Sequence, residues 1–214
     1  MGGAVNIAEF VTRLGEERMP EVFNPWGERD PLDSARLPWL DRRVRLARHL
    51  DCAPRLLLIG EAPGYQGARF SGVPFTGEAQ IFNAVIPRLG AWPRVTSRPN
   101  PWSEPSATIV WKALFEQSIA EQVVLWNAFP YHPHRADEPY SNRAPRRAEL
   151  EAQAWALDAF LRLFPHARAV AVGRVAELAL GILGVVPVAT LRHPARGGAN
   201  EFRRGLAELS QGRA

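Results

Sequence analysis

Residues 55–78 of the chain read RLLLIGEAPGYQGARFSGVPFTGE. They begin with an apolar run at residues 56–59, which lies between a proline and a glycine and is typical of a strand buried on both faces. This strand leads into a loop rich in glycine and proline. Because ligands of open α/β sheets bind beyond the carboxyl ends of the strands, we expect the chemistry of the protein in this loop.

Two common nucleotide-binding motifs are absent from this loop. A GxxxxGK[ST] phosphate loop needs a Lys-Ser or Lys-Thr pair, and none follows the glycines. The GxGxxG spacing of dinucleotide-binding proteins is also missing. Nucleoside triphosphate chemistry is therefore disfavoured. The loop has instead the form GEAPG followed by GVPFTGE.

The rest of the chain alternates between strand and helix patterns. Further strands are expected at residues 122–127, 167–172 and 186–191, and helices at residues 5–17, 34–50, 78–89, 106–121, 144–164, 174–183 and 200–209. This alternation predicts the α/β class, with three α/β/α layers around a mainly parallel four-stranded sheet. No repeat or linker interrupts the pattern, so we expect a single domain over residues 1–214.

Two polar segments have a structural and a functional interpretation. Residues 41–50, DRRVRLARHL, place Val44, Leu46 and Leu50 near one face, which is typical of an amphipathic helix with solvated arginines. Residues 91–105 are rich in proline and are expected to form a surface connection. A loop that contacts the DNA backbone is the alternative, because the segment offers suitable phosphate ligands in Arg94, Ser97, Arg98 and Asn100.

The composition is that of a globular protein with a modest excess of positive charge. Its 214 residues are 46% hydrophobic and 22% charged, which is enough for one sizeable core. A net charge of +4 and a pI near 9.9 suit an anionic partner such as nucleic acid. Lys112 is the only lysine, and a codon bias explains this better than selection of arginine for phosphate binding.

Several classes of site are disfavoured by what the sequence lacks. Cys52 is the only cysteine, which excludes an internal disulfide, a cysteine zinc site and a four-cysteine iron-sulfur cluster. His132 and His134 lie in YHPH without a clear third ligand, so neither a metal nor another cofactor is expected. Residues 1–15 have no signal-peptide pattern, and no apolar run approaches the length of a membrane span.

Three motifs at strand ends resemble the uracil-DNA glycosylase superfamily. The first is the GEAPG loop with Phe75 downstream, the second is VVLWNAFP with Asn127, and the third is RHPARGGANEF with His193. Residues 24–50 and the segment GGANEFRRGL also look like a bacterial branch of the superfamily without the iron-sulfur cluster. The resemblance covers most of the chain. The three motifs in this order are specific, whereas each of them alone is weak.

The resemblance implies a DNA repair enzyme that removes uracil, or a related deaminated base, by hydrolysing the N-glycosidic bond. The base must first leave the duplex stack, and Phe75 would stack on it. The Asn127 amide would donate to uracil O4 and accept from N3–H, a pattern that cytosine does not offer. His193 would donate to O2 as negative charge develops on the leaving base. The expected base-binding residues are Gly60, Ala62, Pro63, Gly64, Phe75 and Asn127.

Two acidic residues are candidates for activating the attacking water. The uracil-specific branch has an aspartate where this chain has Ala62, so that general base is absent. Glu61 is the nearest replacement and is preferred, whereas Glu78 aligns with an acidic residue of a similar TGD segment in another branch. A dissociative mechanism with little help from a base stays open. Gly64 stands where that branch has a tyrosine that blocks the thymine methyl, so weaker selectivity against larger bases is expected.

The third motif also differs from its relatives. Where some members insert an apolar wedge into the DNA, this chain has Arg196, Gly197 and Gly198, which are the expected DNA-binding residues. Arg196 would fill the gap or hold a phosphate. If these residues fill the gap left by the flipped base poorly, single-stranded or mismatched DNA would be the favoured partner.

The resemblance further implies a monofunctional enzyme that leaves an abasic site. Lys112 lies in an expected helix far from the motifs, which disfavours a Schiff base with the sugar. A monomer in the bacterial cytoplasm, associated with the nucleoid and not with a membrane, is expected. Two alternatives are kept: a module of the same fold that binds DNA without cleaving it, which Ala62 makes plausible, and a glycosylase for hypoxanthine or another damaged base.

Overall fold

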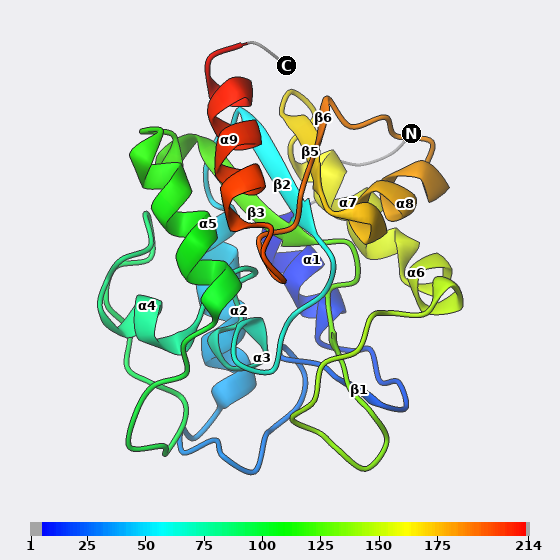
Figure 1. Cartoon of the computed structure of the whole chain (residues 1–214). Helices are drawn as coiled ribbons and strands as arrows, with labels where there is room; N and C mark the ends of the chain where they lie inside the picture. The colour runs from blue at the N-terminus through cyan, green and yellow to red at the C-terminus, as the bar shows by residue number, and fades with distance from the viewer. Residues whose placement is uncertain (1–5, 213–214) are drawn as a thin grey trace.

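A computed structural model describes residues 6–212 and has a four-stranded parallel sheet at its centre (Figure 1). The strand order is β3 (Val123–Asn127), β2 (Leu56–Gly60), β5 (Arg168–Val172) and β6 (Ala189–Leu191). Every residue of β2 and β3 is buried, which explains why both strands read as unbroken apolar runs. The predicted α/β class and the four-stranded parallel sheet are confirmed.

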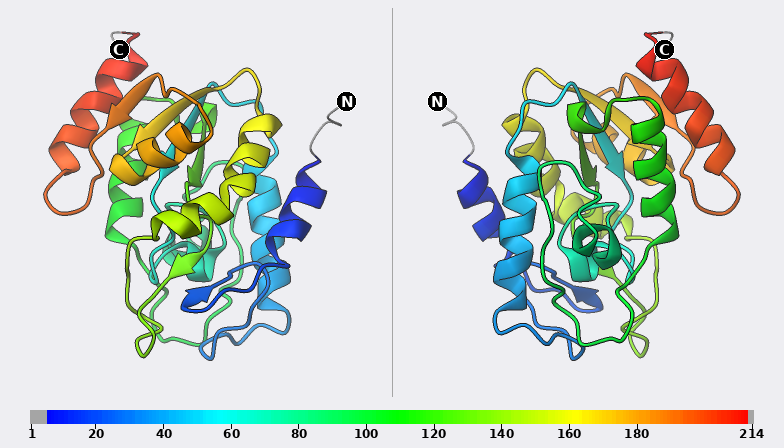
Figure 2. Two further views of the ribbon diagram at one scale, coloured as in Figure 1. Left: turned by 90° about the vertical axis from the view of Figure 1, so that its right-hand side faces the viewer. Right: turned by 90° about the vertical axis from the view of Figure 1, so that its left-hand side faces the viewer.

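Helices cover both faces of the sheet, which gives three layers (Figure 2). Alternate residues of β2 point to opposite faces, so Leu57 and Ile59 join one apolar cluster while Leu56 and Leu58 join the other. The first cluster includes residues of α1 (Ile7–Leu14), α2 (Pro38–Leu50), α7 (Ala154–Leu163) and α8 (Arg174–Ile182). The second cluster includes residues of α4 (Glu78–Phe82), α5 (Pro105–Glu116) and α9 (Ala199–Ser210).

Most predicted elements are present, but several helices are shorter than expected. The helix predicted at residues 78–89 ends at Phe82, because Ala84 and Arg88 have positive φ angles of 55° and 69° that no α-helix contains. The helix predicted at 106–121 ends at Glu116 and is followed by a 3₁₀ turn, η1 (Ala120–Gln122). The helix predicted at 144–164 is two helices, α6 (Arg147–Ala152) and α7, which meet at Gln153.

Helix α2 differs from its prediction at its start and on its polar face. It begins at Pro38 rather than after Ser34, whose hydroxyl instead donates to the carbonyl of Val95. The prediction of solvated arginines is wrong for two of them, because Arg42 and Arg45 are fully buried. Their partners are backbone carbonyls and Asp33 from other segments, which a helical pattern cannot reveal.

Three short elements complete the fold around the strand ends. Strands β1 (Val22–Phe23) and β4 (His132–Pro133) pair antiparallel, and α3 (Ala68–Ser71) lies within the loop that follows β2. None of the three was predicted. The pairing of β1 with β4 joins the N-terminal segment to the loop that follows β3. Val5, the first residue of the predicted N-terminal helix, lies outside the described residues.

Candidate functional site

The three predicted motifs follow strands that end at one edge of the sheet. Gly60 and Asn127 are partners in the register of β2 and β3, so the first two motif loops start side by side. Backbone hydrogen bonds continue this pairing into the loops, from Ala128 N to Gly60 O at 2.9 Å and from Phe129 N to Glu61 O at 3.0 Å. The third loop, with His193, follows β6 at the same edge.

The aromatic, amide and imidazole side chains predicted to bind the base are close together. A methyl group built on Gly60 would overlap the Phe75 ring and would lie 3.0 Å from Asn127 Oδ1. The Phe75 and His193 ring centroids are 6.2 Å apart, and the two rings are inclined by 33°. Phe75 holds a positive φ of 50°, an uncommon conformation for a bulky residue. The structure therefore brings Gly60, Phe75, Asn127 and His193 together, as the motifs predict.

Asn127 has an unused amide. Only 3% of the surface of this residue is accessible to solvent. Among residues 6–212, its amide group makes no hydrogen bond to another residue, and its nitrogen and oxygen are not fully enclosed by the protein. The amide therefore keeps both its donor and its acceptor available at the end of β3, so Asn127 is suited to pair with a bound ligand.

His193 is suited to donate a hydrogen bond from a neutral ring. Burial lowers the pKa of His193 below its usual value of 6.5, and the positive charges of Arg192 and Arg196 lower it further. Its Nδ1 accepts a hydrogen bond from the backbone of Ala195 at 3.2 Å, which leaves the proton of the neutral ring on Nε2. The Nε2–H group can therefore donate to an acceptor without carrying a positive charge.

An open cleft lies beside these residues. It consists of two adjoining cavities of about 430 and 490 Å³ that share six lining residues. The first-motif residues Glu61, Ala62, Pro63 and Gly64 form part of the first cavity, and Arg196 contributes to both. Gly197 lines the second cavity. Gly198 is buried close to the carbonyl of His193, and Gly60, Phe75 and Asn127 do not line either cavity.

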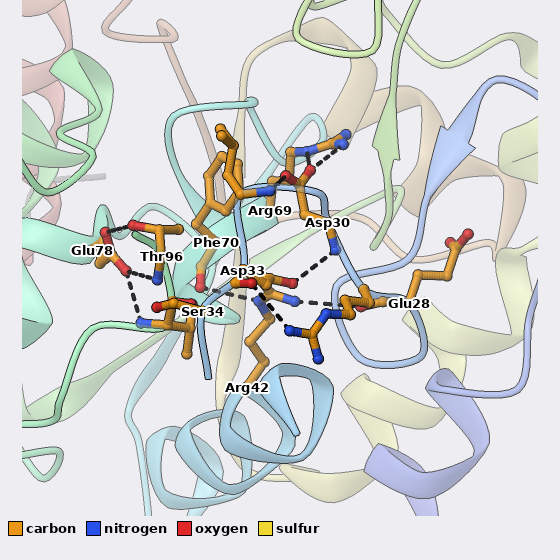
Figure 3. A network of polar contacts seen from close by, with 12 residues as sticks. Glu28, Asp30, Asp33, Ser34, Arg42, Arg69, Phe70, Glu78 and Thr96 are labelled. Atoms are coloured by element: carbon orange, nitrogen blue, oxygen red, sulfur yellow. Dashed lines mark hydrogen bonds and ion pairs between the residues drawn. The ribbon is translucent and has the colours of Figure 1, made fainter. Parts of the chain in front are cut away.

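The two predicted water-activating carboxyls are in different surroundings. Burial raises the pKa of Glu61, and the positive charge of Arg196 offsets part of this increase. Glu78 is 1% exposed, and its oxygens accept from Val95 N, Thr96 N and Thr96 Oγ1 at 2.9, 3.0 and 2.6 Å (Figure 3). Because Glu78 holds the loop at residues 95–96 and does not line the cleft, its predicted catalytic role is not supported.

Sequence reasoning missed two polar residues of the cleft. Glu104 lines both cavities from the N-terminal end of α5, and burial raises the pKa of Glu104 to about 7. Asn142 also lines both, and its Oδ1 accepts from the backbone of Tyr65 at 2.9 Å. No motif marks either residue, since Glu104 lies in a segment whose prolines indicate only a surface connection.

The remaining titratable candidates have structural partners. His132 Nε2 donates to the carbonyl of Ser141, and its Nδ1 accepts from Arg69 at 2.8 Å. Burial lowers the pKa of His132 to about 3, so this ring is neutral. Within the described part of the chain, no three His, Cys, Asp or Glu side chains are grouped to hold a metal ion. Lys112 is exposed on α5, where Glu116 is its ion-pair partner.

Comparison with known proteins defines the class of protein that carries this site. The family model of the uracil DNA glycosylase superfamily matches residues 47–211, and the chain therefore belongs to that superfamily. Membership indicates an enzyme of the DNA glycosylase type, with a role in base excision repair. No helix within residues 6–212 is long and apolar enough to cross a membrane.

A particular solved structure shares the fold. The crystal structure of wild-type SMUG2 from Pedobacter heparinus has a TM-score of 0.61 with this chain at 10% sequence identity, over 96% of each chain. At this identity the similarity concerns the fold alone. Comparison with curated proteins gave no match.

Proposed function

We propose that the protein is a monofunctional DNA glycosylase that hydrolyses the N-glycosidic bond of uracil, or of a related deaminated base, and leaves an abasic site. The observation that carries this proposal is the convergence of Phe75, Asn127 and His193 at the carboxyl edge of the sheet. The Asn127 amide, which makes no hydrogen bond to any of residues 6–212, supports a ligand at this point.

The three side chains have complementary roles toward a flipped base. Phe75 offers its ring for stacking, which repays part of the cost of taking the base out of the duplex. The Asn127 amide donates to O4 and accepts from N3–H of uracil, and cytosine would place a donor against a donor. His193 donates its Nε2–H to O2, where negative charge accumulates as the bond breaks.

The residue that orients the attacking water comes from the first-motif loop. Of the two predicted carboxyls only Glu61 lines the cleft, and we assign to it the orientation of the attacking water. Hydrolysis without strand cleavage agrees with the position of Lys112, which is exposed on α5 and does not line the cleft.

The third-motif loop is proposed to bind the DNA. Arg196 lines both cavities and is exposed, so its guanidinium is free to bind a phosphate. The two glycines that follow it have no side chain to fill the gap left by a flipped base. Single-stranded DNA and mismatched duplexes are therefore the preferred substrates, bound by a monomer.

The test is abasic-site formation on a labelled oligonucleotide with one uracil, either single-stranded or placed opposite G or A. We expect alkali-labile product from the parent and a loss of rate of about 100-fold or more in Asn127→Ala and His193→Ala. Asn200→Ala and His166→Ala are matched controls, because both residues are exposed and do not line the cleft. A strong preference for uracil opposite A would contradict the proposed DNA form.

Other outcomes would identify the alternatives. Tight DNA binding without abasic product on any damaged base would indicate a binding module. Product from hypoxanthine but none from uracil would indicate a purine glycosylase and would remove the pairing proposed for Asn127.

A further inference from the structure

Glu104 lines the same cavity as Glu61 and His193. It is the N-cap residue of α5, and its side chain packs over the first-motif loop. A methyl group built on Gly67 would overlap the Glu104 carboxyl group, and one built on Gly64 would lie 3.2 Å from Glu104 Oε1. The glycines therefore leave the space that this side chain occupies, next to the residues proposed to bind the base.

The charged and titratable groups that line the cavities with Glu104 come from three other segments. They are Glu61 after β2, Arg143 before α6, and Arg192, His193 and Arg196 after β6. Arg143 is already engaged by Glu149, with distances of 2.7 and 2.8 Å. Arg196 influences Glu61, whereas no neighbouring charge is a cause of the shift at Glu104.

The Glu104 carboxyl group has free oxygens. Among the described residues, its Oε1 and Oε2 atoms accept no hydrogen bond, although the side chain is recessed in the cleft. Glu78, by contrast, has both oxygens engaged by the loop at residues 95–96. A recessed carboxyl without partners in a substrate cleft is a candidate for acid-base chemistry rather than for stabilising the fold.

We propose that Glu104 is a catalytic residue that accepts the proton of the attacking water. This role rests on the proposed glycosylase function. The water oxygen bonds to C1′ of the sugar, and the bond from C1′ to the base nitrogen breaks with its electron pair on the base. One water proton passes to the Glu104 carboxylate. The base leaves as an anion that accepts from His193 and is later protonated by solvent.

The environment of Glu104 suits this step better than that of Glu61. A general base works best when its pKa is close to the working pH, and burial raises the pKa of Glu104 to about 7. The two carboxyls thereby have different roles. Glu61, whose pKa is raised by burial and partly lowered again by the charge of Arg196, orients the water, and Glu104, whose pKa no neighbouring charge lowers, accepts its proton.

The test is the single-turnover rate on uracil DNA between pH 5 and 9 for the parent, Glu104→Gln, Glu104→Asp and Glu116→Gln. We expect the parent rate to fall as the pH drops through about 7, where Glu104 becomes protonated. Glu104→Gln should be slower by about 100-fold or more, with unchanged DNA affinity and no such step near pH 7. Glu104→Asp should recover part of the rate.

The controls separate catalysis from folding and from binding. Glu116, at the other end of α5, is exposed and pairs with Lys112, so Glu116→Gln should match the parent. The thermal unfolding of Glu104→Gln shows whether the variant is folded. If it is not, a parent rate that does not fall through pH 7 still overturns the assignment.

Three results would contradict the role of Glu104. The first is a Glu104→Gln rate within about threefold of the parent, and the second is a loss confined to DNA affinity or KM. The third is a step near pH 7 that persists in Glu104→Gln. In each case the proposed function stands, because the parent still forms abasic sites. A parent that forms none on any damaged base overturns the proposed function, and the role of Glu104 with it.

Discussion

Gly60 ends β2 in contact with the Phe75 ring, and no other residue type leaves the ring in place. Asn127, His193 and Phe75 could be predicted together, because the three motifs that contain them resemble those of the superfamily in the same order. Glu104 could not be predicted in this way. It reaches the cleft only because a proline-rich segment folds back over Gly64 and Gly67, and this contact depends on the tertiary structure.

Substituting Gly60 by alanine tests the position of Phe75. The added methyl group overlaps the ring, so the ring must move away from the base-binding point. We expect a loss of rate on the order of 10- to 100-fold and a loss of about 1–3 kcal/mol in the free energy of unfolding. Gly181→Ala on α8 is the control, because no described atom outside its own helix backbone and its chain neighbours lies within 4 Å of the added methyl group. It should keep full activity and gain up to about 1 kcal/mol.

The stability of Glu104→Gln should depend on pH. The carboxyl has its ordinary pKa of 4.5 in the unfolded chain and a pKa of about 7 in the fold. Below pH 4.5 it is protonated in both states, so the variant and the parent should unfold alike. Between about pH 4.5 and 7 the carboxyl ionises in the unfolded chain but stays protonated in the fold, so over this range the parent loses stability that the glutamine variant does not lose. The melting temperature of Glu104→Gln should therefore exceed that of the parent at pH 8. If the variant and the parent melt at the same temperature at pH 8, as they should at pH 4, the assignment is contradicted.

Among the elements, α2 shows where sequence patterns fail. Its periodicity predicted the helix but placed the arginines in solvent, whereas Arg42 is buried against Asp33 and the carbonyls of Glu28 and Phe70 (Figure 3). A second pair, Arg69 with Asp30 at 2.6 Å, lies nearby. These contacts join segments far apart in sequence, so no local rule could have found them.

This network connects the N-terminal segment with the loops that follow β2 and β3. Arg69 belongs to α3 in the first-motif loop, and it contacts His132 in the loop that follows β3. Tyr140 donates to Asp30 at 2.9 Å, which adds a later part of the same loop. The two motif loops are therefore fixed to the N-terminal segment through buried charges.

Removing one member of the Arg42 pair should be more harmful than removing both. Arg42→Met leaves the buried Asp33 carboxylate without its partner and should cost about 3–5 kcal/mol in denaturant unfolding. The double variant Asp33→Asn with Arg42→Met should recover part of this loss. If the losses of the single variants simply add in the double variant, the pair does not stabilise the fold as described.

At the scale of the whole molecule, the fold was the most predictable feature. Two unbroken apolar strands can only lie inside a sheet that is covered on both faces, and the alternating helices provide that cover. Helix ends were less predictable, since Ala84 and Arg88 turn the chain with left-handed conformations that their residue types do not signal. The position of the motifs at one sheet edge could be predicted from the parallel pairing of the strands. The shape of the cleft could not be predicted in this way.

DNA binding by the whole molecule should be electrostatic and therefore weaker at high salt. For single-stranded DNA, removing one phosphate contact reduces the slope of log K against log salt by about 0.7. Arg196→Ala should show this reduction if Arg196 binds a phosphate at the cleft. Arg55→Ala is the control, because Arg55 is exposed next to the amino end of β2, opposite the cleft. An unchanged slope in Arg196→Ala would remove this residue from the DNA-binding surface.

The most direct test of the account is the intact mass of a single-stranded uracil oligonucleotide after incubation with excess protein. We predict that the strand loses one uracil and gains one water while it stays uncut, and that Asn127→Ala and His193→Ala leave the mass of the oligonucleotide unchanged over the same time. A strand cut at the uracil would contradict the monofunctional mechanism. An unchanged mass with the parent protein, for uracil and for other deaminated bases alike, would contradict the central claim that this cleft excises a base from DNA.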